Sequence, residues 1–422
     1  MEEKGAGRKL HFHSDCSFFA GCEHMLAHFW ASPDVRRSYE ISFSHRETAA
    51  YTDGLRRRVG NVDFPVYPLG IFDPSQIVGL MQKIPGGLGK ILGSTLGAAL
   101  EIPMFLHDLF VLTRLFRRIR PDILHINNGG YPGALSCSVA AIAGKICGVK
   151  NVLMMVNNFA IPYSSWRRRA EWILDRIVIR CVDMFVTGSK ATGARLVEVL
   201  RLPPGKVVST PNGINPRPVT ETKAQTMARL GVNGFGGVVF GVVALMETRK
   251  GHHVLLEALA NMAKSDQAVL SNVIVLLEGD GSQRVKLEEF VRNNNLGGVV
   301  RFVGVEKNVS DFFQVLDVLV LPSVSNEDFP NVVSEAMAFG KAVVASRLAG
   351  TPEQIVDGVT GLLVTPGDGV ELAHALEKMA ADAEFRVKCG VEGLRRFRDN
   401  FTSEKGVEGY LNIYKKMTAE VA

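Results

Sequence analysis

The chain has 422 residues and a formal net charge of +5 at pH 7. Its hydrophobic content of 46% and charged content of 22% are ordinary for a globular protein and exclude a disordered chain. The length predicts two or three domains, and the 42 glycines fit an α/β protein with many tight turns. Six cysteines stand singly, without zinc-ligand spacing, which favours core thiols in a reducing compartment over a disulfide framework.

The charge is unevenly distributed. Residues 1–215 hold 26 lysines and arginines against 17 acids, whereas the remainder holds 22 against 26. Basic clusters at 56–58, 114–120 and 167–169 lie near aromatic or apolar residues. They can be interpreted as solvated helix faces or as contacts for anionic lipid headgroups or a phosphorylated acceptor. No nucleic-acid-binding motif accompanies them, so we expect no nucleic-acid partner.

No segment has the pattern of a signal peptide or of a bilayer span. Residues 1–13 are charged and lack an apolar run. Residues 91–112 are apolar but interrupted by Glu101, Pro103 and Asp108, so we expect a helical hairpin or a surface segment there. These features predict a cytoplasmic protein, with peripheral attachment to the membrane as the open alternative.

In the first half, short apolar runs alternate with amphipathic stretches, which predicts βα units and a mainly parallel sheet. The predicted strands are 9–13, 122–126, 152–156, 184–187 and 206–210, and the predicted helices are 24–30, 166–181 and 191–200. Residues 210–218 then contain three prolines and an Asn-Gly pair, which is typical of a domain boundary.

The same alternation restarts after this boundary. The predicted strands are 238–245, 273–278, 300–303, 318–321 and 342–345, and the predicted helices are 252–263, 283–293 and 331–339. We therefore expect an α/β chain of two doubly wound domains, residues 1–212 and 213–404. Ligands of such sheets bind beyond the carboxyl ends of the strands.

One strand end carries the most informative residues. The strand ending at Leu321 is followed by a polar loop and by a helix that begins near Asn331. A helix N-terminus presents N–H groups and a positive dipole end, which suit a diphosphate. Glu327 and Glu335 at the same place could accept hydrogen bonds from sugar and ribose hydroxyls. By spacing alone, they could equally be acids that favour a helix start.

The segment EDFPNVVSEAMAFGKAVVAS, with Glu327 and Glu335 eight positions apart, resembles the donor-binding motif of retaining GT-B glycosyltransferases of family 4 (glycosyl transferases group 1). Further similar segments lie at 241–260, 275–281, 301–304, 317–323 and 349–368. The resemblance covers about residues 238–370, and the N-terminal half matches only loosely. It implies the GT-B fold, in which two Rossmann-like domains face each other across a cleft.

The resemblance also implies residue roles. Glu335 would hold the ribose hydroxyls of the nucleotide, and Glu327 would face the transferred sugar. Lys250 would neutralise the diphosphate as it departs, a role that suits a cation. The backbone along the sugar and diphosphate would be that of Phe329, Pro330, Asn331 and Val332.

The chain departs from the family near this lysine. Relatives commonly carry an arginine five or six residues before it, where this chain has Leu245 and Ala244. Arg249 is the candidate that could replace that arginine at the diphosphate.

In the first domain the matches are weaker. Gly21 resembles the family's glycine loop near the donor phosphate, although turn geometry alone explains a glycine equally well. Asn127 occupies a position where relatives often have histidine; it can hydrogen-bond a sugar hydroxyl but cannot shuttle a proton. We expect His125 to pack inside the strand. The helix at about 405–422 resembles the family's closing helix, which packs back onto the first domain.

Taken together, these residues predict a retaining glycosyltransferase that uses a UDP- or GDP-sugar and a sugar or lipid-linked acceptor in glycoconjugate synthesis. With no Asp-x-Asp and no metal-ligand spacing, we expect neither a cofactor nor an obligatory metal ion. The alternatives are a non-catalytic nucleotide-sugar-binding or scaffold subunit and a sugar-nucleotide epimerase, since a fold does not specify its reaction.

Overall fold

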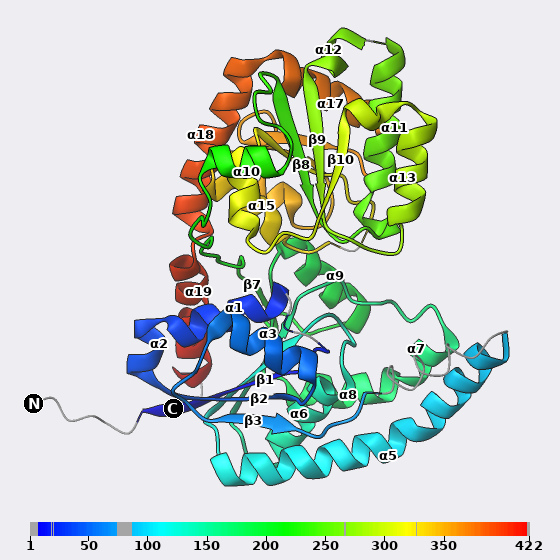
Figure 1. Cartoon of the computed structure of the whole chain (residues 1–422). Helices are drawn as coiled ribbons and strands as arrows, with labels where there is room; N and C mark the ends of the chain where they lie inside the picture. Colours follow the sequence, from blue (N-terminus) through cyan, green and yellow to red (C-terminus); the bar gives the residue numbers. More distant parts are fainter. Residues whose placement is uncertain are drawn as a thin grey trace, which may run out of the picture. The chain divides into compact units, whose positions relative to one another are not determined.

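The computed structural model describes residues 7–17, 19, 21–73, 87–265, 267–325 and 327–419. The chain divides into two compact units (Figure 1). Unit 1 comprises residues 1–210 and 407–422, and unit 2 comprises residues 211–406. The first division coincides with the proline-rich stretch that begins at Pro211.

In the described part of unit 1, seven parallel strands form one sheet in the order β3-β2-β1-β4-β5-β6-β7. Most are short apolar runs covered by helices on both faces, as parallel sheets require. The strands are β1 (Arg8–Ser14), β2 (Tyr39–Arg46), β3 (Val66–Leu69), β4 (Ile123–Asn128), β5 (Asn151–Val156), β6 (Met184–Thr187) and β7 (Val207–Ser209).

The helices of unit 1 connect these strands, and the last one returns to the sheet from the far end of the chain. They are α1 (Gly21–Ala31), α2 (Pro33–Ser38), α3 (Ala49–Val59), α5 (Gly87–Ile119), α6 (Leu135–Ile146), α7 (Trp166–Ala170), α8 (Trp172–Cys181), α9 (Lys190–Leu200) and α19 (Ser403–Ala419). On α19, Tyr410 and Tyr414 are fully buried in the core of unit 1, beside Phe29 and His125.

Two predictions for unit 1 need correction, and two of its strands were missed. Residues 87–119 form one continuous helix through Pro103, so the hairpin alternative was wrong, while Ile102, Leu106 and Phe110 are exposed as a surface segment would require. The predicted helix 166–181 is interrupted at Glu171. The strands β2 and β3 were not predicted at all.

Of the cysteine side chains that the structure describes, five are free thiols.

In the described part of unit 2, six parallel strands form a sheet in the order β10-β9-β8-β11-β12-β13. They are β8 (Val238–Val243), β9 (Val273–Glu278), β10 (Val300–Gly304), β11 (Val318–Leu321), β12 (Ala342–Ser346) and β13 (Gly361–Val364). All but β13 correspond to predicted strands.

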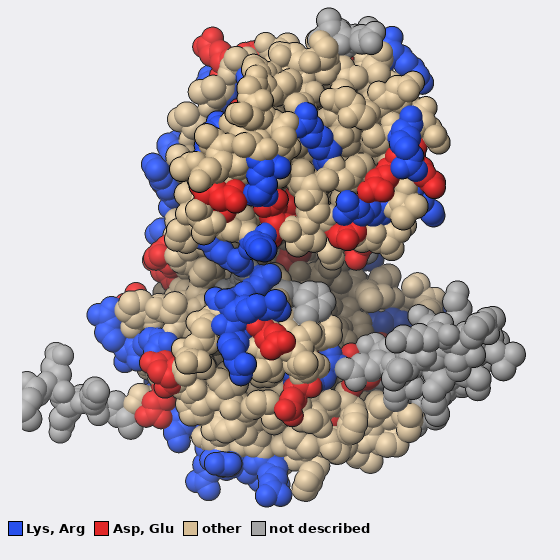
Figure 2. Space-filling model, viewed as in Figure 1, with Lys and Arg blue, Asp and Glu red and all other residues tan. Residues whose placement is uncertain are grey.

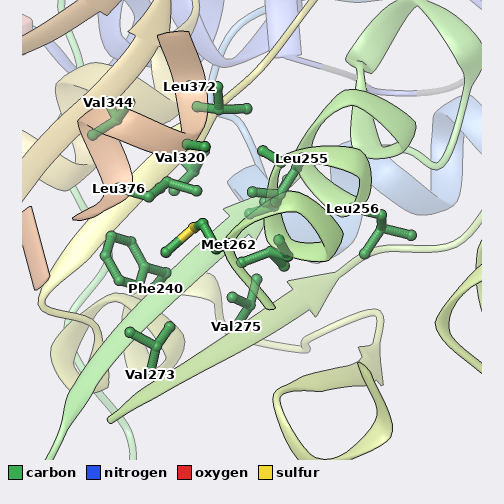
Figure 3. Close-up of a cluster of buried hydrophobic side chains, with 14 of the residues drawn as sticks. Phe240, Leu255, Leu256, Met262, Val273, Val275, Val320, Val344, Leu372 and Leu376 are labelled. Atoms are coloured by element: carbon green, nitrogen blue, oxygen red, sulfur yellow. The ribbon is translucent and has the colours of Figure 1, made fainter. Parts of the chain in front are cut away.

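The helices of unit 2 cover both faces of this sheet. They are α10 (Lys223–Arg229), η1 (Thr248–Lys250), α11 (His252–Ser265), α12 (Gln267–Ser271), α13 (Arg284–Asn293), η2 (Leu296–Gly298), α14 (Val309–Val315), α15 (Asn331–Ala338), α16 (Thr351–Gln354), α17 (Gly369–Ala381) and α18 (Ala383–Asn400). Side chains such as Phe240, Leu255, Met262 and Val275 pack between the sheet, α11 and α17 (Figure 3).

The order of the strands positions the functional regions. In each sheet the strands run outward in both directions from a central pair, β1 and β4 in unit 1 and β8 and β11 in unit 2. The connections after the two central strands therefore turn to opposite sides and leave a crevice at the carboxyl edge. None of the helices in the described ranges combines the length and apolar character needed to cross a bilayer.

Candidate functional site

The crevice of unit 2 brings together two regions that lie far apart in the sequence. After β8 the chain forms the short helix η1, which ends at Lys250, and after β11 it forms the loop that leads into α15. Because β8 and β11 are neighbours, their carboxyl ends place both regions at one edge of the sheet.

Lys250 and Glu327 form an ion pair in this crevice. Their side chains are only 15% and 8% exposed, so water screens the attraction less than at an open surface. The hydroxyl of Ser323 donates a hydrogen bond of 2.7 Å to the same Glu327 oxygen, Oε1. The two residues expected to act on the sugar diphosphate are thus in direct contact.

The backbone of both regions is joined as well. The N–H of Val324 donates to the carbonyl of Arg249 over 2.8 Å. Next to this contact, Gly251 has φ +70, and a Cβ there would lie 1.8 Å from the carbonyl oxygen of Pro322. Only glycine allows this left-handed conformation and this close approach together.

Hydrogen bonds from Gln354 hold the N-terminus of α15 in position. Pro330 occupies the N-cap position and offers no side-chain oxygen to the first-turn N–H groups. The fully buried amide of Gln354 donates to the carbonyl of Pro330 over 3.1 Å and to the hydroxyl of Ser334 over 2.9 Å. The first turn, with Asn331 and Val332, is therefore oriented by the protein with its positive dipole end toward the loop.

The loop before α15 is also buried, and contacts with neighbouring segments hold it in position. Phe329 is 5% exposed and packs edge-on against Phe401, with ring centres 5.5 Å apart. The carbonyl of Asp328 accepts a 2.7 Å hydrogen bond from the N–H of Gly350. The backbone expected to lie against the sugar and diphosphate thus has a defined path.

Glu335 lies one turn into α15 and is partly buried. Its negative charge acts on a second carboxylate, Glu278, at the end of β9. Burial, with smaller contributions from Glu306 and Glu335, raises the pKa of Glu278 to about 7. The N–H of Glu306 donates to Glu278 Oε1 over 3.0 Å.

Glu278 was not recognised in the sequence as a site residue. The signal was present, because an acid ends an otherwise apolar strand directly before Gly-Asp-Gly. A buried acid at a strand's carboxyl end is more informative than one on a solvated helix.

Residues 244–246, where this chain lacks the family's arginine, pack tightly against the turn that follows β9. A Cβ at Gly279 would lie 2.1 Å from the carbonyl of Ala244, and the N–H of Met246 donates to the carbonyl of Asp280 over 2.9 Å. Leu245 is half exposed. Arg249, the predicted substitute, forms an ion pair with Glu247 over 2.7 Å. Its assignment to the diphosphate stays a prediction.

In unit 1 the predicted residues lie at the corresponding crevice between β1 and β4. Gly21 begins α1, after β1, and is exposed. Asn127 is 2% exposed and donates to Ser14 Oγ over 3.1 Å, while Asn157 donates to its amide oxygen over 2.8 Å. Ser14 in turn donates to Glu23. The Asn127 amide is therefore held in a buried chain of hydrogen bonds, and its contact with a sugar stays a prediction.

His125 is buried as expected. It packs beside Phe12, Phe29 and Tyr410, and its Nδ1 lies 2.5 Å from the hydroxyl of Tyr414. Burial lowers the pKa of His125 to about 3, so it is neutral at pH 7.

The same edge of unit 1 contains an ion pair that the sequence did not indicate. Asp15, just after β1, pairs with Arg46 at the end of β2 over 2.8 Å, and both side chains are almost fully buried. Ser136 donates to Asp15 Oδ2 over 2.5 Å. Burial raises the pKa of Asp15 to about 6. Within the described ranges, no three His, Cys, Asp or Glu residues are grouped as metal ligands would be.

Two family models match the chain. Residues 236–396 match the model described as "Glycosyl transferases group 1", and residues 92–217 match the one described as "Glycosyltransferase Family 4". Together these ranges include Lys250, Glu327 and Glu335 in unit 2 and Asn127 in unit 1.

Relatives that match part of the chain are named as glycosyltransferases. The chain is 33% identical over 165 residues to the lipopolysaccharide core biosynthesis glycosyltransferase LpsE of Rhizobium meliloti, covering 39% of this chain and 46% of the relative. It is 28% identical over 259 residues to the D-inositol 3-phosphate glycosyltransferase of Saccharomonospora viridis, covering 60% and 59%. The matches thus span about half the length of these relatives.

Solved structures share the fold over nearly the whole chain. HepE of Anabaena, crystallised in complex with UDP, aligns with a TM-score of 0.74 at 18% identity, covering 97% of this chain and 100% of HepE. The sucrose-phosphate synthase of Thermosynechococcus elongatus aligns with a TM-score of 0.68 at 19% identity, covering 98% and 100%. The chain therefore belongs to the glycosyltransferases described by the group 1 and family 4 models, and it has the GT-B fold.

Proposed function

We propose that the protein transfers a sugar from a UDP- or GDP-sugar to a hydroxyl group of an acceptor, with retention of the anomeric configuration and without an obligatory metal ion. The observation that carries this proposal is the Lys250–Glu327 ion pair beside the N-terminus of α15. The ion pair supplies a cation and a carboxylate, and α15 adds a positive helix end in the same crevice.

The donor diphosphate would lie at the first turn of α15 and attract Lys250 away from Glu327. Glu327 would then accept hydrogen bonds from the hydroxyls of the transferred sugar, and Glu335 from those of the ribose. The backbone of residues 329–332 would line the sugar and diphosphate. A cation is most effective where negative charge grows in the transition state, which here is the leaving diphosphate.

In the transfer step, the acceptor oxygen forms a bond to the anomeric carbon as the bond from that carbon to the diphosphate oxygen breaks. The acceptor proton goes to the departing diphosphate, and both events take place on one face of the sugar. Retention follows without an enzyme nucleophile. Lys250 and the α15 dipole would balance the diphosphate charge, which is the basis for proposing that no metal is needed.

The named relatives support the donor and acceptor classes. HepE was crystallised with UDP and with UDP-glucose, and LpsE is named for lipopolysaccharide core biosynthesis. We accordingly propose a sugar or lipid-linked acceptor in polysaccharide, lipopolysaccharide or other glycoconjugate synthesis, recognised by unit 1 around Gly21 and Asn127. The proposed location is the cytoplasm, at the membrane surface where the acceptor is lipid-linked.

The test is a panel of UDP- and GDP-sugars incubated with glycan and lipid-linked acceptors. Release of nucleoside diphosphate that depends on the acceptor and persists in EDTA supports the proposal. Proton NMR of the product then reports whether the anomeric configuration is retained. Donor binding without release of nucleoside diphosphate in the presence of any acceptor would instead support the non-catalytic alternative, which the missing arginine at 244–245 and Asn127 leave open.

A further inference from the structure

Unit 1 contains a cavity that the sugar-transfer proposal does not use. It has a volume of about 440 Å³ and lies between α8, α9 and the segment 162–169. Its lining includes four arginines and a single acid, which are Arg169, Arg176, Arg195, Arg201 and Glu198.

Most of this positive charge is not neutralised by the protein. Arg195 pairs with Glu198 over 2.7 Å. The nearby Asp175 is occupied elsewhere, because it pairs with Arg168 over 2.7 Å. Within the part of the chain that the structure describes, Arg169, Arg176 and Arg201 form no ion pair, which leaves an excess of three positive charges around one cavity.

Contacts within the protein hold two of these arginines, Arg169 and Arg176, in place. Arg176 donates to the carbonyl of Leu200 and stacks over Trp172, with its guanidinium carbon 5.6 Å from the ring centre. Arg169 donates through Nε to the carbonyl of Tyr163 over 3.1 Å. Arg201 ends α9 in the left-handed conformation, with φ +52. Fixed guanidinium groups recognise phosphate oxygens with little loss of side-chain entropy.

One exposed aromatic side chain lines the cavity, and other exposed apolar side chains lie close to the lining residues in the sequence. Trp172 lines the cavity and is 50% exposed, and its neighbour Ile173 is 67% exposed. Trp166 on α7 and Ile161 before it are exposed as well. Tryptophan beside arginine is typical of surfaces that meet a phosphate group attached to an apolar body.

A second cavity of unit 1 provides a contrast. Basic side chains gather at the C-terminal end of α5 (Figure 2), and a cavity of about 480 Å³ there is lined by Lys9 and Arg118 but also by Glu40 and Asp63. Its charges balance, although its volume is similar. A large cavity near arginines is therefore not enough to predict an anion site.

We propose that the cavity between α8 and α9 binds the phosphate group of an anionic ligand whose apolar part lies against Trp172. Two sources have this chemistry, an anionic lipid headgroup and a soluble phosphorylated compound. The site does not depend on sugar transfer, so binding and turnover can be tested separately.

The experiment compares the full chain with the double variant Arg169→Gln, Arg201→Asn. Both arginines are exposed, and asparagine tolerates the left-handed conformation at 201. Arg118→Gln, at the balanced cavity, is the control for loss of a positive charge away from the proposed site. Circular dichroism confirms that each variant is folded. The probes are phosphatidylcholine vesicles with and without phosphatidic acid, and glycerol 3-phosphate in solution, at physiological salt.

We expect the double variant to bind at least one probe on the order of tenfold more weakly or worse, and Arg118→Gln to bind normally. Loss with phosphatidic acid vesicles alone identifies a lipid headgroup, and loss with glycerol 3-phosphate identifies a soluble ligand. Trp172→Ala, which keeps every charge, should weaken vesicle binding if the lipid is the ligand. The proposal is overturned if neither probe binds the wild type, or if Arg118→Gln weakens binding as much as the double variant.

Discussion

Lys250 and Glu327 are 77 positions apart in the chain and form an ion pair at the carboxyl edge of the second sheet. The contact exists because β8 and β11 lie side by side and each sends its following segment into the same crevice. Ser323 holds the Glu327 oxygen that receives the lysine. When a donor diphosphate enters this crevice, Lys250 would leave Glu327 and pair with the diphosphate. Both side chains are already positioned there, so neither has to be ordered on binding.

Lys250→Ala should lower kcat about a hundredfold to a thousandfold while weakening donor binding much less. The reason is that Lys250 opposes charge that is larger on the leaving diphosphate than on the bound donor. Steady-state kinetics at saturating donor and a direct donor titration separate the two effects. Lys264→Ala, an exposed lysine in the last turn of α11, is the control. A kcat near the wild-type value for Lys250→Ala would place the diphosphate elsewhere.

Glu335→Ala should raise the donor dissociation constant about tenfold or more, because hydrogen bonds from ribose hydroxyls to a charged acceptor are lost. Isothermal titration with the preferred nucleoside diphosphate measures this directly and needs no acceptor. The matched control is Glu384→Ala, an exposed acid in the first turn of α18. If both variants bind the nucleotide as the wild type does, Glu335 is only a favourable acid near a helix start.

Gly251→Ala should destabilise unit 2 by about 2 kcal/mol or more, because alanine is strained at φ +70 and its Cβ would meet the carbonyl oxygen of Pro322. Since that carbonyl belongs to the loop before Glu327, activity should fall together with stability. Urea unfolding measures the change. Gly297→Ala is the control, since a Cβ there would meet open space. Equal stability of the two variants would refute the close approach.

Donor affinity should fall as the pH rises through about 7. Glu278 has a raised pKa of about 7, so it is largely neutral below that pH and negative above it. The added charge lies in the electrostatic range of Glu335 and would repel the donor diphosphate. We expect the dissociation constant to increase on the order of threefold to tenfold between about pH 6 and pH 8.

Glu278→Gln tests this assignment, because glutamine keeps the shape and cannot titrate. Its donor affinity should stay nearly constant over the same pH range. A wild-type pH dependence that persists in Glu278→Gln would assign the titration to another group.

Most strands of unit 2 could be predicted because they are short, mainly apolar runs, as in residues 273–277, which precede Glu278 in β9. Strand β2 could not, since polar residues such as Ser44, His45 and Arg46 occupy buried positions, and β3 has only four residues, of which Leu69 alone is buried. In β2, Ser42 and Ser44 are satisfied by cross-strand contacts of 2.8 Å with His11. A hydropathy pattern records the polar residue but not the partner that makes its burial tolerable.

The sequence by itself determined the two doubly wound units and the local motif that contains Glu327 and Glu335, because both depend on residues close together in the chain. Only the tertiary structure decided that Lys250 meets Glu327, that Glu278 lies within the influence of Glu335, and that four arginines surround one cavity. These relationships follow from strand order and helix packing, which bring distant segments together. Local sequence patterns cannot predict them, because such patterns depend only on residues that are close together in the chain.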